Sequence, residues 1–122
     1  MSWNDAEQTC KSTGGHLVSI LTEQENNYVR RVAFANGLMD ELHIGLRNSN
    51  QNQNTWSWIG GESMDYTNYS NGNPNQGLGQ CSTMSILGKP VNATASPQDY
   101  PGKWKSVDCA TNMPFICEKI SK

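Results

Sequence analysis

Residues 104–118 read WKSVDCATNMPFICE, and this stretch carries two of the four cysteines of the chain between short aromatic and aliphatic runs. The runs on either side of Cys109 have the composition of short strands. The other two cysteines, Cys10 and Cys81, lie far upstream. An even number of cysteines in a small chain indicates a disulfide framework, although more than one pairing is possible and the sequence alone chooses none of them.

Length and composition indicate one small domain. The chain has 122 residues, so we expect a single domain over residues 1–122. Its mean hydropathy is −0.67, which predicts a modest core that crosslinks would reinforce. The net charge of −2 gives no electrostatic basis for binding nucleic acid. No apolar run approaches the roughly 18 residues of a membrane span, and we expect that a targeting segment ahead of Met1 has been removed.

Polar caps and apolar spacing predict two helices. Ser2 caps the first helix, which ends at the Gly14-Gly15 pair. Residues Thr22–Glu25 form a capping-box pattern that opens the second helix, and Gly37 ends it.

The remaining apolar runs predict short strands separated by long irregular segments. Residues 60–79 and 88–102 are rich in Gly, Asn and Pro and follow neither a helical nor a strand period. An irregular segment of that length in a compact domain is typical of a functional loop. The predicted fold class is therefore α+β, with two helices packed on short antiparallel strands. The expected strands are Leu17–Ile20, His43–Leu46, Thr55–Trp58, Cys81–Ile86, Trp104–Val107 and Phe115–Ile120.

No set of side chains predicts catalysis or a metal centre. His16 and His43 have no Cys, Asp or Glu at metal-ligand spacing, so we expect them to flank the core. No Cys-x-x-Cys pair indicates zinc, and no serine lies in a Gly-x-Ser-x-Gly elbow. The aromatic rings of Trp56, Trp58 and Trp104 could stack on a sugar, but we expect them to build the core. The chain is predicted not to be an enzyme.

Two glycosylation sequons favour the secretory route. Asn68-Tyr69-Ser70 and Asn92-Ala93-Thr94 both fall in loop-like sequence, so Asn68 and Asn92 are the predicted attachment sites. Together with the paired cysteines they predict a secreted, extracellular protein.

Several stretches in order along the chain match the landmarks of one known family: Trp3 to Cys10, Gly14 to Ile20, Ile44-Gly45-Leu46 with His43 in place of a tryptophan, Trp56 to Gly61, Tyr66 to Tyr69, and Phe115 to Glu118. Together they resemble the C-type lectin-like domain, in particular that of secreted invertebrate-type C-type lectins. The resemblance implies a non-catalytic recognition module and the disulfides Cys10–Cys117 and Cys81–Cys109. In the chain-entropy model these two crosslinks contribute about 4–5 and about 3–4 kcal/mol.

One departure from the family pattern is structural. Members of the family have a strand before the first helix that pairs with the last strand, whereas this chain begins at that helix. We therefore expect the first family strand to be absent and the Phe115–Ile120 edge to be open, which is an invitation to pair with a second copy.

The other departure concerns calcium. In calcium-dependent members an acidic triplet around a proline, an upstream Glu and a Trp-Asn-Asp triplet bind the ion and two sugar hydroxyls. This chain carries Asn73-Pro74-Asn75, Gly79 and Trp104-Lys105-Ser106 at those positions. Neutral amides replace carboxylates, and calcium affinity depends on carboxylate number. Lys105 adds a positive charge, and its ammonium at 4–8 Å would repel the calcium ion by about 4–8 kcal/mol at an effective dielectric near 20.

A second calcium position of the family is equally poor in acids, since Asn48, Asn52 and Gln80 occupy it. We therefore predict no metal and no cofactor. The predicted function is recognition of a glycan without calcium, or alternatively of an extracellular protein through the long-loop face. In the glycan hypothesis Lys105 replaces the metal and favours anionic sugars. The candidate ligand-binding residues are Asn73, Asn75, Lys105 and Ser106.

Overall fold

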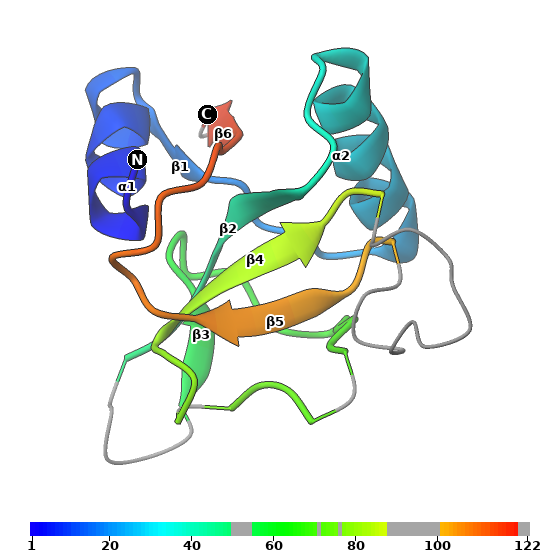
Figure 1. Cartoon of the computed structure of the whole chain (residues 1–122). Helices are drawn as coiled ribbons and strands as arrows, with labels where there is room; N and C mark the ends of the chain where they lie inside the picture. The colour runs from blue at the N-terminus through cyan, green and yellow to red at the C-terminus, as the bar shows by residue number, and fades with distance from the viewer. Residues whose placement is uncertain (50–54, 71, 76, 88–100, 120–122) are drawn as a thin grey trace.

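The computed structural model describes residues 1–49, 55–70, 72–75, 77–87 and 101–119, and it has the predicted α+β architecture (Figure 1). A two-stranded sheet has the order β1-β6, and a four-stranded sheet has the order β3-β2-β4-β5, with all pairs antiparallel. Within the described residues, neither helix has the length and apolar character that crossing a bilayer requires. The elements are α1 (Trp3–Ser12), β1 (Gly15–Leu17), α2 (Glu23–Ala35), β2 (Glu41–Asn48), β3 (Trp56–Trp58), β4 (Cys81–Ser85), β5 (Trp104–Val107) and β6 (Cys117–Lys119).

Both helices begin and end where the caps predict. Ser2 Oγ accepts a hydrogen bond from the backbone N–H of Asp5 at 3.3 Å, and α1 is followed by Gly14. Thr22 Oγ1 caps α2 by accepting from Glu25 N at 3.1 Å. The Glu25 carboxylate does not close the predicted capping box on Thr22 but accepts from Leu21 N, one residue earlier. The capping box therefore keeps the bond from Glu25 N to Thr22, while its second bond is made to the backbone one residue earlier.

The predicted strands are found at the expected places in the chain, but their lengths differ. The first strand, β1, begins two residues before the predicted Leu17–Ile20 and ends at Leu17. It ends there because the carbonyl of Val18 accepts from the backbone of β2, and Ser19 N donates to the Glu118 side chain at 2.7 Å. The last strand is shorter than predicted, since Phe115 makes only an isolated bridge to β2, and Ile120 lies outside the described residues.

The four-stranded sheet separates two apolar clusters. Leu42, Met84 and Trp104 are register partners on β2, β4 and β5 and belong to the larger cluster, into which α2 also packs. Cys81 belongs to the smaller cluster, together with Trp3 and other residues of α1. Because side chains alternate along a strand, the same strands supply both clusters. The helices lie apart in Figure 1, with β1, β6 and β2 between them.

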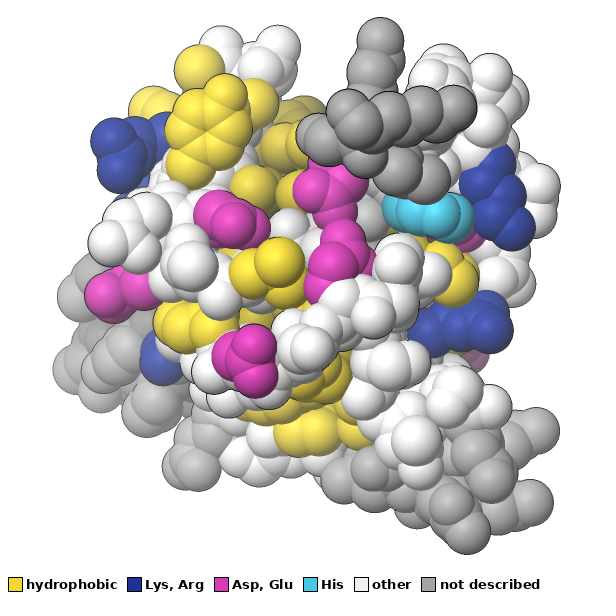
Figure 2. All heavy atoms as spheres, turned by 180° about the vertical axis from the view of Figure 1, so that it is seen from behind, with side chains coloured by type: hydrophobic (Ala, Val, Ile, Leu, Met, Phe, Trp, Pro, Cys, Tyr) yellow, Lys and Arg dark blue, Asp and Glu magenta, His cyan; other side chains and the backbone are white. Residues whose placement is uncertain are grey.

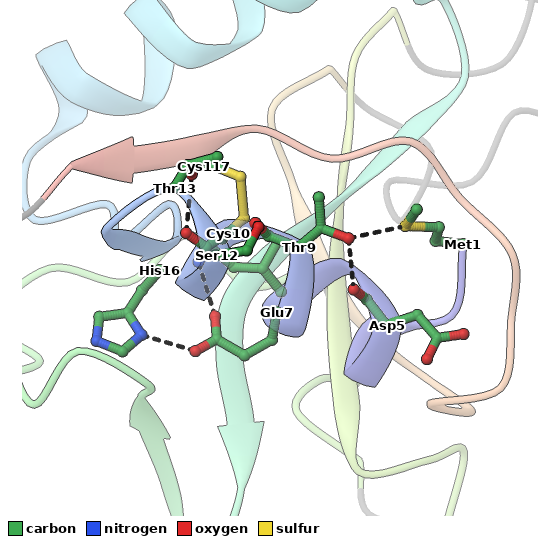
Figure 3. Close-up of a disulfide and its surroundings, with 10 residues drawn as sticks. Met1, Asp5, Glu7, Thr9, Cys10, Ser12, Thr13, His16 and Cys117 are labelled. Carbon is green, nitrogen blue, oxygen red and sulfur yellow. Dashed lines mark hydrogen bonds and ion pairs between the residues drawn. A yellow bond between two sulfur atoms is a disulfide. The ribbon is translucent and has the colours of Figure 1, made fainter.

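Both disulfides implied by the family resemblance are present in the structure. Cys10–Cys117 joins α1 to β6 over a sequence separation of 107 residues (Figure 3). Cys81–Cys109 joins the start of β4 to the segment after β5 over 28 residues. The first crosslink joins α1 to the last strand, and the second closes the segment that runs from β4 through β5, directly after the irregular segment 60–79.

The two histidines lie in structural positions, as predicted. His43 is buried in β2, where its Nε2 lies 2.9 Å from the Met1 carbonyl, and burial lowers its pKa. His16 Nδ1 lies 2.6 Å from Glu7 Oε2, a contact that ligand-spacing rules missed because the two residues lie on different elements (Figure 3). The other oxygen of Glu7 accepts from Leu17 N at 2.9 Å. This buried carboxylate fastens α1 to β1.

Candidate functional site

The irregular segment 60–79, called the long loop from here on, meets the four-stranded sheet alongside β5. Tyr69 and Trp104 form an isolated bridge, in which Ser70 N donates to the Trp104 carbonyl at 2.8 Å. The buried Ser70 hydroxyl donates to the same carbonyl at 3.0 Å. Trp104 N donates in turn to the Asn68 carbonyl at 3.0 Å. These bonds place the loop residues that follow next to Lys105 and Ser106.

Three of the four predicted binding residues meet at this point and bond to one another. Ser106 N donates to Asn73 Oδ1 at 2.9 Å, and Ser106 Oγ accepts from Asn75 N at 2.8 Å. The amide nitrogen of Asn73 donates to Ser70 Oγ at 3.0 Å. The Asn73–Pro74 peptide bond is cis. We call Ser70, Asn73, Asn75 and Ser106 the loop clasp, because their mutual hydrogen bonds hold the loop on β5.

Lys105, the fourth candidate binding residue, does not join the clasp, so its ammonium does not take the place of a metal beside Asn73 and Asn75 in this structure. Lys105 Nζ lies 2.8 Å from Glu41 Oε2 on β2, and the other Glu41 oxygen accepts from Thr83 Oγ1 at 2.6 Å. Successive side chains on a strand point to opposite faces of the sheet. Since Ser106 faces the loop, its neighbour Lys105 faces the other way. Its carboxylate partner could not be found from sequence spacing alone.

The second position where the family holds calcium shows the same kind of replacement. Asn48 Nδ2 donates to Gln80 Oε1 at 2.8 Å, and the backbone N–H of Asn48 donates to the Gln80 carbonyl at 2.8 Å. Asn48 Oδ1 accepts from Thr55 N at 3.0 Å. Asn52, the third residue predicted there, lies outside the described residues. At this position too, side-chain amides join segments that are distant in sequence.

The residues at both positions do not fit calcium. The ion requires six to eight oxygen ligands and gains affinity from carboxylates. The clasp supplies amide and hydroxyl groups that already bond to one another, and the Asn48–Gln80 pair does the same. Within the described ranges, no group of three or more His, Cys, Asp or Glu side chains has the geometry to hold a metal ion.

The tip of the loop beyond the clasp is held in a defined shape. Asn75 Oδ1 accepts from Gly77 N at 2.9 Å, and Leu78 N donates to the Asn75 carbonyl at 2.9 Å. Gly79 has a φ of +146°, and a Cβ there would lie 2.0 Å from the Val107 carbonyl oxygen. A side chain at this position is excluded because the loop lies directly on the end of β5. Leu78, 57% exposed, projects from this fixed backbone.

An aromatic cluster around Trp104 packs against the loop residues Tyr66 and Tyr69. Trp104 is fully buried, and the rings of Trp58, Tyr66 and Tyr69 meet it edge to face, with centroids 5.3, 5.8 and 5.7 Å away. Its Nε1 donates to Asn26 Oδ1 on α2 at 2.8 Å. Burial raises the pKa of Tyr69 to about 12. The prediction that these tryptophans belong to the core is confirmed for Trp58 and Trp104.

The glycosylation predictions gain no support from the fold. Asn68 Nδ2 donates to the Gly102 carbonyl at 2.8 Å, and Asn68 Oδ1 accepts from Lys103 Nζ at 3.0 Å. A glycan on this nitrogen would have to fit against the segment that precedes β5. Asn92 lies outside the described residues.

Sequence comparison matches the chain to one family and to named relatives. The model of the lectin C-type domain matches residues 1–119. A snaclec of Philodryas olfersii is 32% identical over 125 residues, covering 99% of this chain and 67% of the snaclec. The secretory phospholipase A2 receptor of Homo sapiens is 30% identical over 124 residues, which cover 98% of this chain but 7% of that much longer receptor.

Solved structures agree with this match. Human lithostathine superposes with a TM-score of 0.75 at 28% identity, over 95% of this chain and 82% of that one. A calcium-independent type II antifreeze protein superposes with a TM-score of 0.73 at 26% identity, over 96% of this chain and 77% of that one.

Proposed function

The chain belongs to the C-type lectin domain family, and from this premise we propose that it is a secreted, non-catalytic recognition module whose long loop is ordered without calcium. The loop clasp carries this proposal. A calcium ion would join the loop to β5 through shared oxygen ligands, and here the side chains of Asn73 and Ser106 make that connection themselves. The antifreeze protein with the same fold is described as calcium-independent, which supports a fold that functions without the ion.

The ligand we propose is the surface of an extracellular protein. A sugar bound at the clasp would need free amide and hydroxyl groups, but both polar atoms of the Asn73 side chain are used within the protein. The apolar side chain of Leu78 faces solvent from the same loop, near the exposed Asn75. A preorganised loop with an exposed apolar side chain binds with a smaller ordering cost than a mobile one.

A catalytic role has no support in the described part of the chain. His43 is buried against the Met1 carbonyl, and His16 is engaged by Glu7 beside β1. Neither lies near a nucleophile and a base in the arrangement that acyl or phosphoryl transfer needs. Secretion is supported by the two disulfides, which persist in oxidising compartments.

An array of purified extracellular proteins, run beside a glycan array, tests the proposal. Both are probed with a multivalent form of the domain, in calcium and in chelator. We expect protein partners whose binding survives chelator and is lost with Leu78→Asp. The matched control is Leu87→Asp, because Leu87 is 40% exposed at the other end of β4. Glycan binding that requires calcium contradicts the proposal, and glycan binding in chelator favours the sugar hypothesis instead.

A further inference from the structure

A hollow lies beside the exposed Leu78, at the tip of the long loop. Its volume is about 350 Å³, within the range of sites that accept a small ligand or a side chain of a partner. Residues 77–80 line one side of the hollow, and Asp108 and Cys109, which follow β5, line the other. No residue of the loop clasp is among the described residues that line it. We call this hollow the tip recess.

Two glycines give the tip recess its shape. Gly77 and Gly79 have no side chains to fill it, and Leu78 stands between them. Gly79 lies in direct contact with the chain that leaves β5, because a Cβ there would be only 2.4 Å from Asp108 N. On the other side, the hydrogen bonds of Gly77 N and Leu78 N to Asn75 hold the loop backbone. The tip recess is therefore preformed, which lowers the ordering cost of binding.

The tip recess holds a carboxylate that the protein does not neutralise. Asp108 is exposed, and its Oδ1 accepts a hydrogen bond from Ala110 N at 2.9 Å. In the described part of the chain, no Lys, Arg or His side chain forms an ion pair with Asp108. Arg47, the register partner of Cys81, has its guanidinium over the Trp3 ring instead, 5.6 Å from the ring centroid. The second oxygen of Asp108 is therefore open to a cation from outside.

The walls of the tip recess suit an arginine side chain. Beside Asp108, they consist of the apolar Leu78, two glycines, the Gln80 side chain and the disulfide that joins Cys109 to β4. The methylene stem of an arginine packs along apolar surface while its charged end stays at a polar group. The planar guanidinium has five N–H donors in a fixed fork, so it can donate to a carboxylate and to a nearby backbone carbonyl at once. The single ammonium of a lysine matches such a site less well.

The charge of the whole domain also favours a basic occupant. The chain has a net charge of −2. Figure 2 shows acidic side chains gathered at the centre of the face seen from behind, with basic ones toward its edges. Lys105, the described cation nearest to Asp108 in sequence, is paired with Glu41. Because the net field is negative, it attracts a basic partner and favours association with it.

We propose that the tip recess binds an arginine side chain of the extracellular partner protein, next to an apolar side chain that packs on Leu78. This inference rests on the function proposed above and names the chemistry of the partner. The guanidinium donates to the free oxygen of Asp108, and the stem of the arginine lies along Leu78 and Cys109. An acidic side chain in the same place would be repelled by Asp108, so the tip recess selects partners by charge.

The test uses two small probes with the isotope-labelled whole chain, in chelator and at low salt. The first probe is N-acetyl-leucyl-arginine amide, and the second has citrulline in place of arginine, which keeps the shape but removes the charge. We expect the arginine probe to shift the amide resonances of Gly77, Gly79 and Asp108. It should bind about fivefold more tightly than the citrulline probe, which is the most that an exposed ion pair usually adds.

Variants identify the carboxylate that is responsible. Asp108→Asn keeps an oxygen for Ala110 N, so it should leave the melting temperature unchanged and weaken the arginine probe about fivefold, to the level of the citrulline probe. Leu78→Ala should weaken both probes equally. The control Asp65→Asn removes an exposed charge outside the recess and should change neither.

Several results would overturn the proposal. These are equal binding of the two probes by the wild type, no shifts at tens of millimolar, and shifts confined to residues outside the tip recess. A dimer in sedimentation that is lost with Asp108→Asn makes a second copy the occupant and also overturns it. Protein partners that are lost with Leu78→Asp but unaffected by Asp108→Asn overturn this inference alone, whereas an array without protein partners overturns the function proposed above.

Discussion

Two regions of the domain reach a fixed structure by different physical means. The region of α1, β1 and β6 is held by buried apolar side chains and by the Cys10–Cys117 disulfide. The described loop residues 70, 72–75 and 77–80 are instead fastened to β5 by short polar side chains, with Asn73 and Ser106 at the centre. We propose that the loop is therefore ordered without a core of its own and without a metal, because its polar atoms find partners within the protein.

The comparison predicts that the largest single loss of stability comes from the first region. Cys10→Ser with Cys117→Ser removes a crosslink that spans 107 residues, whereas Cys81→Ser with Cys109→Ser removes one that spans 28. In the chain-entropy model the free energy of unfolding falls by about 5 kcal/mol in the first variant and about 3.5 in the second. Guanidinium unfolding of both variants measures the difference. An equal loss, or the reverse order, contradicts the assignment.

A smaller loss of stability is expected where the region of α1, β1 and β6 meets β2. A Cβ on Gly45 would lie 2.6 Å from the Leu17 carbonyl oxygen and 3.1 Å from that of Val18, and neither backbone can move freely. Gly45→Ala should therefore cost about 1–3 kcal/mol in unfolding free energy. The control is Gly60→Ala, whose Cβ would meet only the side chain of Glu62, which can rotate away. If the two variants unfold at the same denaturant concentration, the close approach at Gly45 is not the constraint described.

In the loop region the predicted loss of stability is smaller, and it is confined to the loop and β5. Asn73→Ala removes the bonds to Ser106 N and Ser70 Oγ, which should cost about 1–2 kcal/mol. Hydrogen exchange should show faster exchange of the Ser106 amide and unchanged protection in α1. Asn112→Ala, at an exposed position, serves as the control. Uniform loss of protection over the whole domain would mean that the two regions are not independent in the way proposed.

The smallest predicted effect is a gain in stability, from a substitution at Glu118. The pKa of Glu118 is raised by burial and by its acidic neighbours, so the folded state holds the proton more tightly than the unfolded state does. The wild type therefore loses stability as the pH rises through the interval between the unfolded and folded pKa values. Glu118→Gln should be slightly more stable at neutral pH, and the difference should vanish below about pH 4, where the wild type is protonated. Urea unfolding at both pH values measures it, and a variant less stable at neutral pH refutes it.

Sequence reasoning predicted most of the first region because its signals are local. Capping residues placed both helices, and apolar runs placed the strands to within a few residues. The disulfide pairing came from the family resemblance, since cysteine spacing alone left it open. The pattern could not predict that Glu7 would meet His16, because the contact depends on how α1 packs beside β1.

The site was predicted only in part, and strand geometry explains the error. Asn73, Asn75 and Ser106 do meet, as their positions in the family imply. Lys105 is a candidate because Trp104-Lys105-Ser106 stands where the family carries Trp-Asn-Asp, but adjacent residues on a strand face opposite sides of the sheet. Its partner, Glu41, lies two strands away, and no pattern in the sequence joins them.

The central claim is that the protein's own hydrogen bonds, rather than calcium, order the long loop. Hydrogen exchange of the Asn75 and Ser106 amides, measured in chelator and again in 10 mM calcium (about tenfold above a millimolar dissociation constant), tests it most directly. Both amides donate to side chains of the clasp, so we predict the same protection in the two conditions and its loss in both with Asn73→Ala. Exchange that is fast in chelator and becomes protected only when calcium is added would contradict the account.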